Sequence, residues 1–311
     1  MSKPMQSLKI IAFPGAPNLP VYAAIEHGFF EAENIDLDFS TTSSSLQQMT
    51  KFATGECDIV FTAFDNIVAY REGQGAIKFD TVPDFEVILG ATQIELSIVV
   101  APDISSASGL KGKTLALDAI STGFAFVCYQ ALETLGLPYD AYTPVAVGAT
   151  PERWLSLKEG KHAGTITIEP FTSIALAAGF RLLARSSDMF PAYQGGIIAV
   201  RHQWASANAN PIESFIRVYL KSLNWVLDPA NRAEATSLLL KYMPEVKPGV
   251  VNTVIESLLS PRSGLTPNGA VLRDGMKTVL DLRSRFGRPH TLFTDIDKYL
   301  NLSFYERVLR K

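Results

Sequence analysis

The sequence predicts an α/β fold of two similar lobes, and three observations lead to this prediction. Apolar runs typical of buried strands are followed repeatedly by a short loop and by a helix with a capping residue at its start. One such arrangement recurs at the same spacing in both halves of the chain. A length of 311 residues, 47% of them hydrophobic and 19% charged, is enough for two lobes of ordinary domain size.

The first unit begins with an apolar strand at residues 8–13. Asn18 is a good N-cap for the helix that follows, Pro20 lies in its first turn, and Gly28 can end it in the left-handed conformation. The loop therefore directs a helix N-terminus, with free N–H groups and a partial positive charge, beyond the carboxyl end of the strand. In open α/β sheets ligands bind at that edge.

The second unit begins at residues 35–39, where apolar and acidic residues alternate as in a half-exposed strand. Ser45 and Gln48 have the spacing of a capping box, and apolar residues then recur at helical spacing as far as Gly55. We expect a helix from Ser45 to Gly55.

The remaining strands of the first half follow closely. Residues 58–62 predict a third strand that leads into a short helix at 67–72. Residues 85–90 and 98–101 are rich in β-branched and apolar side chains, and they predict two more strands.

The strand and helix pattern then restarts. We expect strands at 114–118 and 145–147, and helices at 124–135 and 153–158. Thr150 is the predicted N-cap of the second helix, with proline next to it at the first helical position.

The two halves correspond in spacing. In each half the capping residue precedes the helix-ending glycine by ten positions, and the glycine precedes a strand-ending threonine by seven. These residues are Ser45, Gly55 and Thr62 in the first half, and Thr150, Gly160 and Thr167 in the second. The match indicates two lobes whose ligand edges face each other.

The chain is expected to leave the first lobe and to return to it. Residues 1–95 together with 196–311 form lobe I in this prediction, and residues 96–195 form lobe II; a strand at 197–200 carries the chain back. The C-terminal part is mostly helical, with apolar stripes at helical spacing. We expect these helices to cover lobe I and the back of the hinge, and to carry no chemistry.

Composition and motifs exclude several classes of function. A net charge of -3, a pI near 5.9 and the lack of a Lys or Arg block argue against nucleic-acid binding. No catalytic motif, metal-ligand spacing or dinucleotide fingerprint is found, so no cofactor and no metal is expected. Cys57 and Cys128 are predicted to be separate buried thiols, the alternative being a disulfide that ties the two halves together.

The candidate ligand site lies where capped helix starts and strand ends converge. It consists of Asn18, Ser43, Ser44, Ser45, Thr62, Phe64 and Asp65 from lobe I, and Thr122, Gly123, Thr150 and Glu169 from lobe II. Such a site offers many hydroxyl and N–H groups and few fixed charges. For each Ser or Thr the alternative is an ordinary cap of its own helix.

The charged candidates bear on the kind of ligand. If Asp65 and Glu169 both face the cleft, they favour an amine or a ring N–H over a bare sulfonate. Asp65 could instead cap its helix, and Glu169 could point to solvent. Arg153 would favour an acid, or it lies solvated on its helix face. Phe64, with Phe124, Phe171 and Tyr193, offers walls for a flat ligand or simply packs in the core.

Several segments also resemble a known family, the substrate-binding proteins of ABC importers. They are Asn18-Leu19-Pro20-Val21-Tyr22-Ala23-Ala24, His27-Gly28-Phe29-Phe30, Ser43-Ser44-Ser45, Gly55-Glu56-Cys57-Asp58-Ile59, Asp65-Asn66 and Gly73-Gln74-Gly75. The chain looks most like the branch that groups sulfonate and taurine binders (SsuA/TauA-like) with thiamine-pyrimidine (NMT1/THI5-like) proteins. The likeness covers the first hundred residues well, and residues 118–125 and 160–170 extend it.

The resemblance implies a type II periplasmic-binding-protein fold, with two α/β lobes, a hinge and an inter-lobe ligand cleft. It implies a solute-binding protein that encloses a small polar organic ligand of the sulfonate, aromatic acid or pyrimidine/amine type. The partner would be an ABC permease in the membrane, and we expect a monomer. It also implies a periplasmic or cell-envelope location; the sequence as given shows no secretory signal, which keeps a cytoplasmic location open.

Two alternatives remain at this level. The first is an enzyme on the same fold, resembling a thiamine-pyrimidine synthase or a desulfinase, and the second is a cytoplasmic ligand sensor. The synthase branch carries a cysteine-rich run that this chain lacks. Cys57 precedes its strand instead of following it toward the cleft. We therefore expect no enzyme activity.

Overall fold

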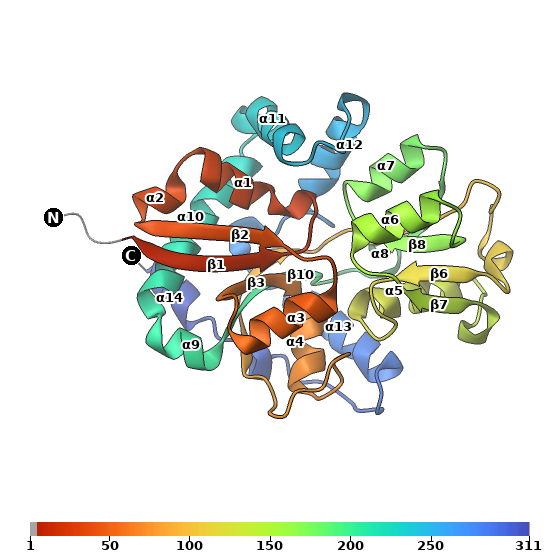
Figure 1. Cartoon of the computed structure of the whole chain (residues 1–311), viewed down its shortest axis with the longest axis horizontal. Coiled ribbons are helices and arrows are strands. Elements are labelled where there is room, and N and C mark those ends of the chain that lie inside the picture. The colour runs from red at the N-terminus through yellow and green to blue at the C-terminus, as the bar shows by residue number, and fades with distance from the viewer. Residues whose placement is uncertain (1–4, 311) are drawn as a thin grey trace.

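The protein has two α/β lobes that lie side by side (Figure 1). This architecture comes from a computed structural model in which residues 5–310 are described. Each lobe contains a five-stranded mixed sheet with helices packed against it. The predicted α/β fold class is therefore confirmed.

The strands of lobe I, in their order across the sheet, are β2 (Ile35–Thr41), β1 (Gln6–Ala12), β3 (Ile59–Ala63), β10 (Gly196–Arg201) and β4 (Phe85–Thr92). The strands of lobe II are β7 (Thr143–Ala146), β6 (Thr114–Leu117), β8 (Gly164–Thr167), β5 (Ser97–Val100) and β9 (Arg181–Arg185).

Both sheets have the same topology. In each, the first three strands of the α/β pattern are parallel, and one antiparallel strand separates them from the last strand. That antiparallel strand is β10 in lobe I and β5 in lobe II, the strand that the chain forms directly after it crosses from the other lobe. The spacing match in the sequence thus identified equivalent helix and strand pairs.

Helices occupy the connections and most of the C-terminal third. They are α1 (Leu19–Glu26), α2 (Phe29–Ala32), α3 (Ser45–Thr54), α4 (Phe64–Arg71), α5 (Gly123–Thr134), α6 (Thr150–Lys158), α7 (Phe171–Ala177), α8 (Ser186–Met189), α9 (His202–Ala207), α10 (Ala209–Leu227), α11 (Arg232–Tyr242), α12 (Pro248–Leu258), α13 (Arg273–Phe286) and α14 (Ser303–Leu309). The expected helix at 67–72 is α4, which begins three residues earlier.

Two predicted helix caps are wrong by one residue. Ser44, and not Ser45, is the N-cap of α3, and its hydroxyl accepts from the N–H of Gln47 at 3.2 Å. Ala149 takes the N-cap position of α6, so Thr150 is the first helical residue. Before α3, a run of Ser and Thr residues offers several caps of equal quality, and the sequence alone does not choose between them. Before α6 the cap position is held by alanine, which has no capping side chain.

The core of lobe I follows the period of a strand. In β1, Leu8 and Ile10 face the side of the sheet covered by α1 and α10, whereas Ile11 faces the side covered by α3 and α4. The central strand β3 is buried on both faces. Such burial is expected of a parallel strand with helices on both sides.

The C-terminal helices do more than cover lobe I. Helices α10, α11 and α14 pack on lobe I, but α12 also contacts α7, and α13 packs against both α4 of lobe I and α5 of lobe II. A single hydrophobic cluster continues from lobe I through α13 into α5. The prediction that these helices serve only lobe I and the hinge is therefore too narrow.

Two short segments connect the lobes. The chain passes between them after Thr92 and again before Gly196, and the N–H of Gly195 donates to the carbonyl of Gln93 at 3.1 Å. Ile94 lies in the first crossing with φ of +62°, a strained conformation for a β-branched residue. These crossings form the hinge; the exact lobe boundaries stay a prediction.

The two cysteines are free and buried, as predicted. Within residues 5–310, no helix combines the length and the apolar character that a membrane crossing requires.

We expect Gly195→Ala to lower the free energy of unfolding by about 1–3 kcal/mol, because a side chain there would overpack the hinge. A Cβ at this position would lie 2.1 Å from Cγ2 of Ile94 and 2.5 Å from the carbonyl oxygen of Gln93. Gly249→Ala is the matched control, since Gly249 is exposed at the start of α12 with no atom within 4 Å of its Cβ position. Urea unfolding of both variants checks this. Equal stabilities would contradict tight packing at the hinge.

Candidate functional site

A cavity lies between the two lobes, at the carboxyl ends of their parallel strands. The space free of protein atoms, counted out to the mouth where it meets solvent, is about 810 Å³. Phe13, Asp118 and Ile168 line it, and they follow the last residues of β1, β6 and β8 respectively. The cavity therefore occupies the edge at which the sequence places a ligand.

Four helices begin at the cavity. The residues that line it are Asn18 before α1, Ala63 before α4, Gly123 at the start of α5 and Thr150 at the start of α6. None of the four helix starts is capped by a side chain. Their partial positive charges are directed toward the cavity, which favours a ligand group with negative charge.

Arg153 is the one cation among the lining residues, and it is buried with 2% of its surface exposed. Its guanidinium donates to the carbonyls of Gly148 at 2.7 Å and Ile166 at 3.0 Å, and to the hydroxyl of Thr150 at 2.9 Å. Burial lowers the pKa of Arg153 to about 10, so it stays charged at neutral pH. The alternative that Arg153 is solvated is therefore wrong.

The hydroxyl groups of the cavity have defined roles. The oxygen of Thr150 accepts from Arg153, and that of Thr62 accepts from Nδ2 of Asn66 at 2.9 Å, so both hydroxyl protons remain to be donated. Thr122 differs, because its hydroxyl donates to the carbonyl of Ala119 at 3.1 Å and leaves only lone pairs. Each lobe thus brings one hydroxyl donor to the cavity.

The rest of the wall is mostly apolar. Aromatic rings come from Phe13, Phe61 and Phe124, and aliphatic side chains from Ile94 and Ile168. Among the lining residues Asp118 is the one carboxylate. A pocket with apolar walls and a few polar groups is typical of small-molecule sites.

The lobes touch along one rim of the cavity, formed by residues 43–45 of lobe I and by Asp118 and Ala149 of lobe II. Both carboxylate oxygens of Asp118 accept from the N–H of Ser45 at 3.2 Å, and the N–H of Ala149 donates to the carbonyl of Ser43 at 2.8 Å. On another side, the N–H of Ala16 donates to the carbonyl of Glu169 at 3.1 Å. The two lobes are thus in direct contact on two sides of the cavity.

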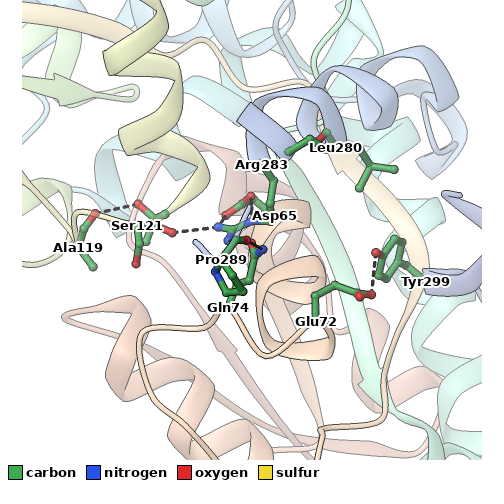
Figure 2. Close-up of polar contacts among 11 residues, drawn as sticks. Asp65, Glu72, Gln74, Ala119, Ser121, Leu280, Arg283, Pro289 and Tyr299 are labelled. Carbon is green, nitrogen blue, oxygen red and sulfur yellow. Dashed lines mark hydrogen bonds and ion pairs between the residues drawn. The ribbon is translucent and has the colours of Figure 1, made fainter. Parts of the chain in front are cut away.

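Asp65 does not offer a free carboxylate to a ligand. It is 1% exposed and forms a bidentate ion pair with Arg283 of α13, with both N–O distances at 2.6 Å (Figure 2). The condition for favouring an amine, a carboxylate that faces the cleft, is therefore not met. The alternative that Asp65 caps its helix is wrong as well, because no side chain caps α4. Its neighbour Phe64 is fully buried and packs edge-on against Tyr299, in the core and not at the cavity.

Glu169 lies beside the main cavity, not in it. It lines a small adjoining cavity with Glu95, and its carboxylate accepts from the N–H and hydroxyl of Ser173 at 3.3 and 3.0 Å. Burial raises the pKa of Glu169 to about 7, and nearby Glu95 adds to the rise, while Ser173 and Arg185 oppose it. The alternative that it points to solvent is wrong.

The predicted residues thus divide into two groups. Those that line the cavity are Asn18, Thr62, Thr122, Gly123 and Thr150. Those that do not are Ser43, Ser44 and Ser45 at the rim, Phe64 and Asp65 in the interior, and Glu169 in the adjoining cavity. Asn18 occupies the N-cap position, but its side chain donates to the carbonyl of Phe13 at 2.7 Å instead of capping.

Some lining residues were absent from the predicted set. Phe13 and Asp118 had a usable signal, because each is the last residue of a predicted strand, whereas Phe61 and Ile94 had none. Of the aromatic side chains proposed as ligand walls, only Phe124 lines the cavity.

Neither thiol lines the cavity, and burial raises the pKa of both Cys57 and Cys128 to about 12. Within the described part of the chain, no three His, Cys, Asp or Glu side chains gather in a way that could hold a metal ion.

The chain is similar to known proteins in sequence and in fold. The sequence model of the NMT1-like family matches residues 2–240. No curated protein matches the chain.

Solved structures match over nearly the whole chain. A protein of Bordetella bronchiseptica RB50 has a TM-score of 0.81 at 18% identity, over 98% of this chain and 97% of that one. The alkanesulfonate-binding protein SsuA of Xanthomonas axonopodis pv. citri, bound to MOPS, has a TM-score of 0.73 at 17% identity, over 94% and 97%. The periplasmic nitrate-binding protein NrtA of Synechocystis PCC 6803 has a TM-score of 0.78 at 10% identity, over 98% and 89%. The predicted type II periplasmic-binding-protein fold is thereby confirmed.

We expect the free energy of unfolding to fall as pH rises from about 4.5 to about 7, in part because of Glu169. Its native pKa of about 7 lies above the ordinary value of 4.5, so in this range the native state holds a proton that the unfolded state has lost. Glu169→Gln should flatten this part of the profile. Urea unfolding at several pH values measures it.

Glu306→Gln is the control, because Glu306 is an exposed carboxylate on α14. This variant should keep the wild-type profile. An unchanged profile in Glu169→Gln would show that Glu169 is ionised in the native state at pH 5.

Proposed function

This chain belongs to the NMT1-like family, and from that membership and the geometry of its cavity we propose that it is the solute-binding protein of an ABC importer. The observation that carries the proposal is one cavity enclosed by two lobes, with a hydroxyl donor from each. The fold shared with the alkanesulfonate-binding and nitrate-binding proteins supports it.

Ligand binding would act by a shift in population. Open and closed arrangements of the lobes are in equilibrium, and a ligand that contacts both lobes favours the closed arrangement by its differential affinity. Thr62 of lobe I and Thr150 of lobe II would both donate to the ligand only when the lobes meet.

The ligand class that the cavity favours is an organic anion with an apolar body. Hydroxyl donors, uncapped helix starts and the buried charge of Arg153 suit an oxyanion. The Phe and Ile side chains suit the rest of the molecule. Asp118 repels a second negative group but accepts an amine, so sulfonates and carboxylates with or without an amine all belong to the class.

The partner and location follow from the same proposal. A solute-binding protein delivers its closed form to the permease of its importer, and we place this chain in the periplasm or cell envelope as a monomer. The location that the name of the nitrate-binding protein gives supports this.

The cavity gives little support to an enzyme. A desulfinase or synthase of this fold would need a nucleophile or base at the ligand, and both thiols lie elsewhere with raised pKa values. The hydroxyl groups of Thr62 and Thr150 are bonded to Asn66 and Arg153, neither of which is a general base.

A thermal-shift screen tests the ligand class. We expect stabilisation by alkyl and aryl sulfonates or aromatic carboxylates, and none by polyamines or neutral pyrimidines. A ligand present at about 100 times its Kd adds about 2.7 kcal/mol of stability. Taurine compared with ethanesulfonate shows whether an amine matters. Recovery of the hit unchanged by mass spectrometry supports binding, whereas its conversion would overturn the proposal in favour of an enzyme.

Isosteric variants test the hydroxyl donors. Thr62→Val and Thr150→Val should each weaken binding of the anionic hit about 10- to 100-fold, because a hydrogen bond to a charged group contributes about 1.5–3 kcal/mol. Thr122→Val is the matched control, since Thr122 presents only lone pairs and should leave the affinity unchanged or slightly improved. Isothermal titration calorimetry measures all three. Equal affinities across the set would argue against an anionic ligand at these groups.

A further inference from the structure

A fully buried ion pair lies where three distant parts of the chain meet. Asp65 is in the first turn of α4 in lobe I, Arg283 is on α13, and the carbonyl of Ser121 is in the loop before α5 in lobe II. Figure 2 shows the guanidinium of Arg283 between Asp65 and Ser121.

Each of the three nitrogens of the guanidinium has a hydrogen-bond partner. It forms two bonds of 2.6 Å with Asp65, one of 2.9 Å with the carbonyl of Ser121 and one of 3.1 Å with Oε1 of Gln74. Its flat face lies over the ring of Phe126 in α5, 4.8 Å from the centroid. The exposed fraction of the side chain is 0% for Arg283 and 1% for Asp65.

Both partners are continuous with segments that line the ligand cavity. Thr62 at the end of β3 and Asn66 lie on either side of Asp65 in the chain, and Thr122 and Gly123 follow Ser121. The starts of α4 and α5 touch directly, because a Cβ on Gly123 would lie 2.5 Å from Cβ of Asp65. The position of Arg283 therefore fixes the position of both segments.

The same cluster lies against the second hinge crossing. The N–H of Phe64 donates to the carbonyl of Gly195 at 3.1 Å, and the N–H of Leu272, just before α13, donates to Gln194 at 2.7 Å. Gly275 of α13 packs against the backbone of Tyr193 and Gln194.

From these contacts we propose that Arg283 is a positioning residue, which holds the start of α4 in lobe I and the start of α5 in lobe II together at the pivot of lobe closure. The pivot is defined here as Asp65, Ser121, Gly123 and Arg283. Separating a buried ion pair leaves uncompensated charge in the interior. At the rim, by contrast, Ser43 is exposed and Asp118 is half-buried, although their partners Ala149 and Ser45 are buried, and the contacts are hydrogen bonds to backbone N–H groups. The lobes therefore part at the rim and stay joined at the pivot. This inference rests on the proposed function only in assuming that the lobes open and close around a ligand.

Pulsed electron spin resonance distances in the ligand-free protein test the proposal. Both native thiols are buried, so nitroxide labels can be placed at introduced cysteines. Thr54→Cys with Lys158→Cys reports on the rim from the far ends of α3 and α6, and Thr134→Cys with Asp281→Cys reports on the pivot from α5 and α13; all four positions are exposed. We expect Asp118→Ala to lengthen the rim distance and to leave the pivot distance unchanged.

The ion pair is tested with a charge-neutral replacement, Asp65→Leu with Arg283→Met, which avoids an unpaired buried charge. We expect it to unfold cooperatively and to broaden the pivot distance distribution. Arg283→Lys, which keeps the charge but loses the planar fork, should broaden it as well. Arg285→Met is the control on the same helix, because its ion pair with Glu133 is exposed, and it should change neither distance.

Two results would overturn the proposal. One is a pivot distance that lengthens with the rim distance in Asp118→Ala, and the other is an unchanged pivot distribution in both Arg283 variants. These measurements use no ligand. A failure here is therefore distinguishable from a failure of the proposed solute-binding function, which the thermal-shift screen decides.

Discussion

The ion pair between Asp65 and Arg283 is the interaction on which the arrangement of the cavity depends. It joins three parts of the chain: the first turn of α4 in lobe I, the loop before α5 in lobe II, and helix α13 in the C-terminal segment. A buried pair of this kind is stable only where hydrogen bonds compensate for the lost solvation. Each of the three guanidinium nitrogens has at least one partner, and the ring of Phe126 covers the group. Cavity-lining segments from both lobes are thereby held in register.

The chemistry of the cavity follows from what its polar groups already bond. Arg153 can only donate, so the oxygen of Thr150 must accept and its proton is left for a ligand. In Thr122 the proton is used and the lone pairs remain. Threonine hydroxyl groups in the same cavity therefore differ in whether they can donate to a ligand or only accept from it. The difference arises from their hydrogen-bond partners, which residue type alone does not reveal.

Local signals in the sequence predicted the fold well and the site only in part. Periodicity and the repeated spacing predicted every strand of lobe I and four of the five strands of lobe II, because these signals depend on neighbours within about ten residues; β9 at Arg181–Arg185 was missed. The same signals placed Asp65 at the ligand edge, where its backbone does lie, but its partner Arg283 is 218 positions away. Arg153 was misjudged for a related reason, since the carbonyl of Ile166 that holds it comes from a separate strand. Side-chain partners at long range decided which candidates face the cavity.

The two sides of the cavity differ in what an opening of the lobes would expose to water. At the pivot the charges are buried and paired, so opening there would leave each charge uncompensated. At the rim, the buried N–H groups of Ser45 and Ala149 donate to half-buried Asp118 and to the carbonyl of exposed Ser43. Water can take the place of these partners when the rim opens. Under the proposed function, a ligand that bonds to both lobes favours the closed arrangement by its differential affinity for that arrangement.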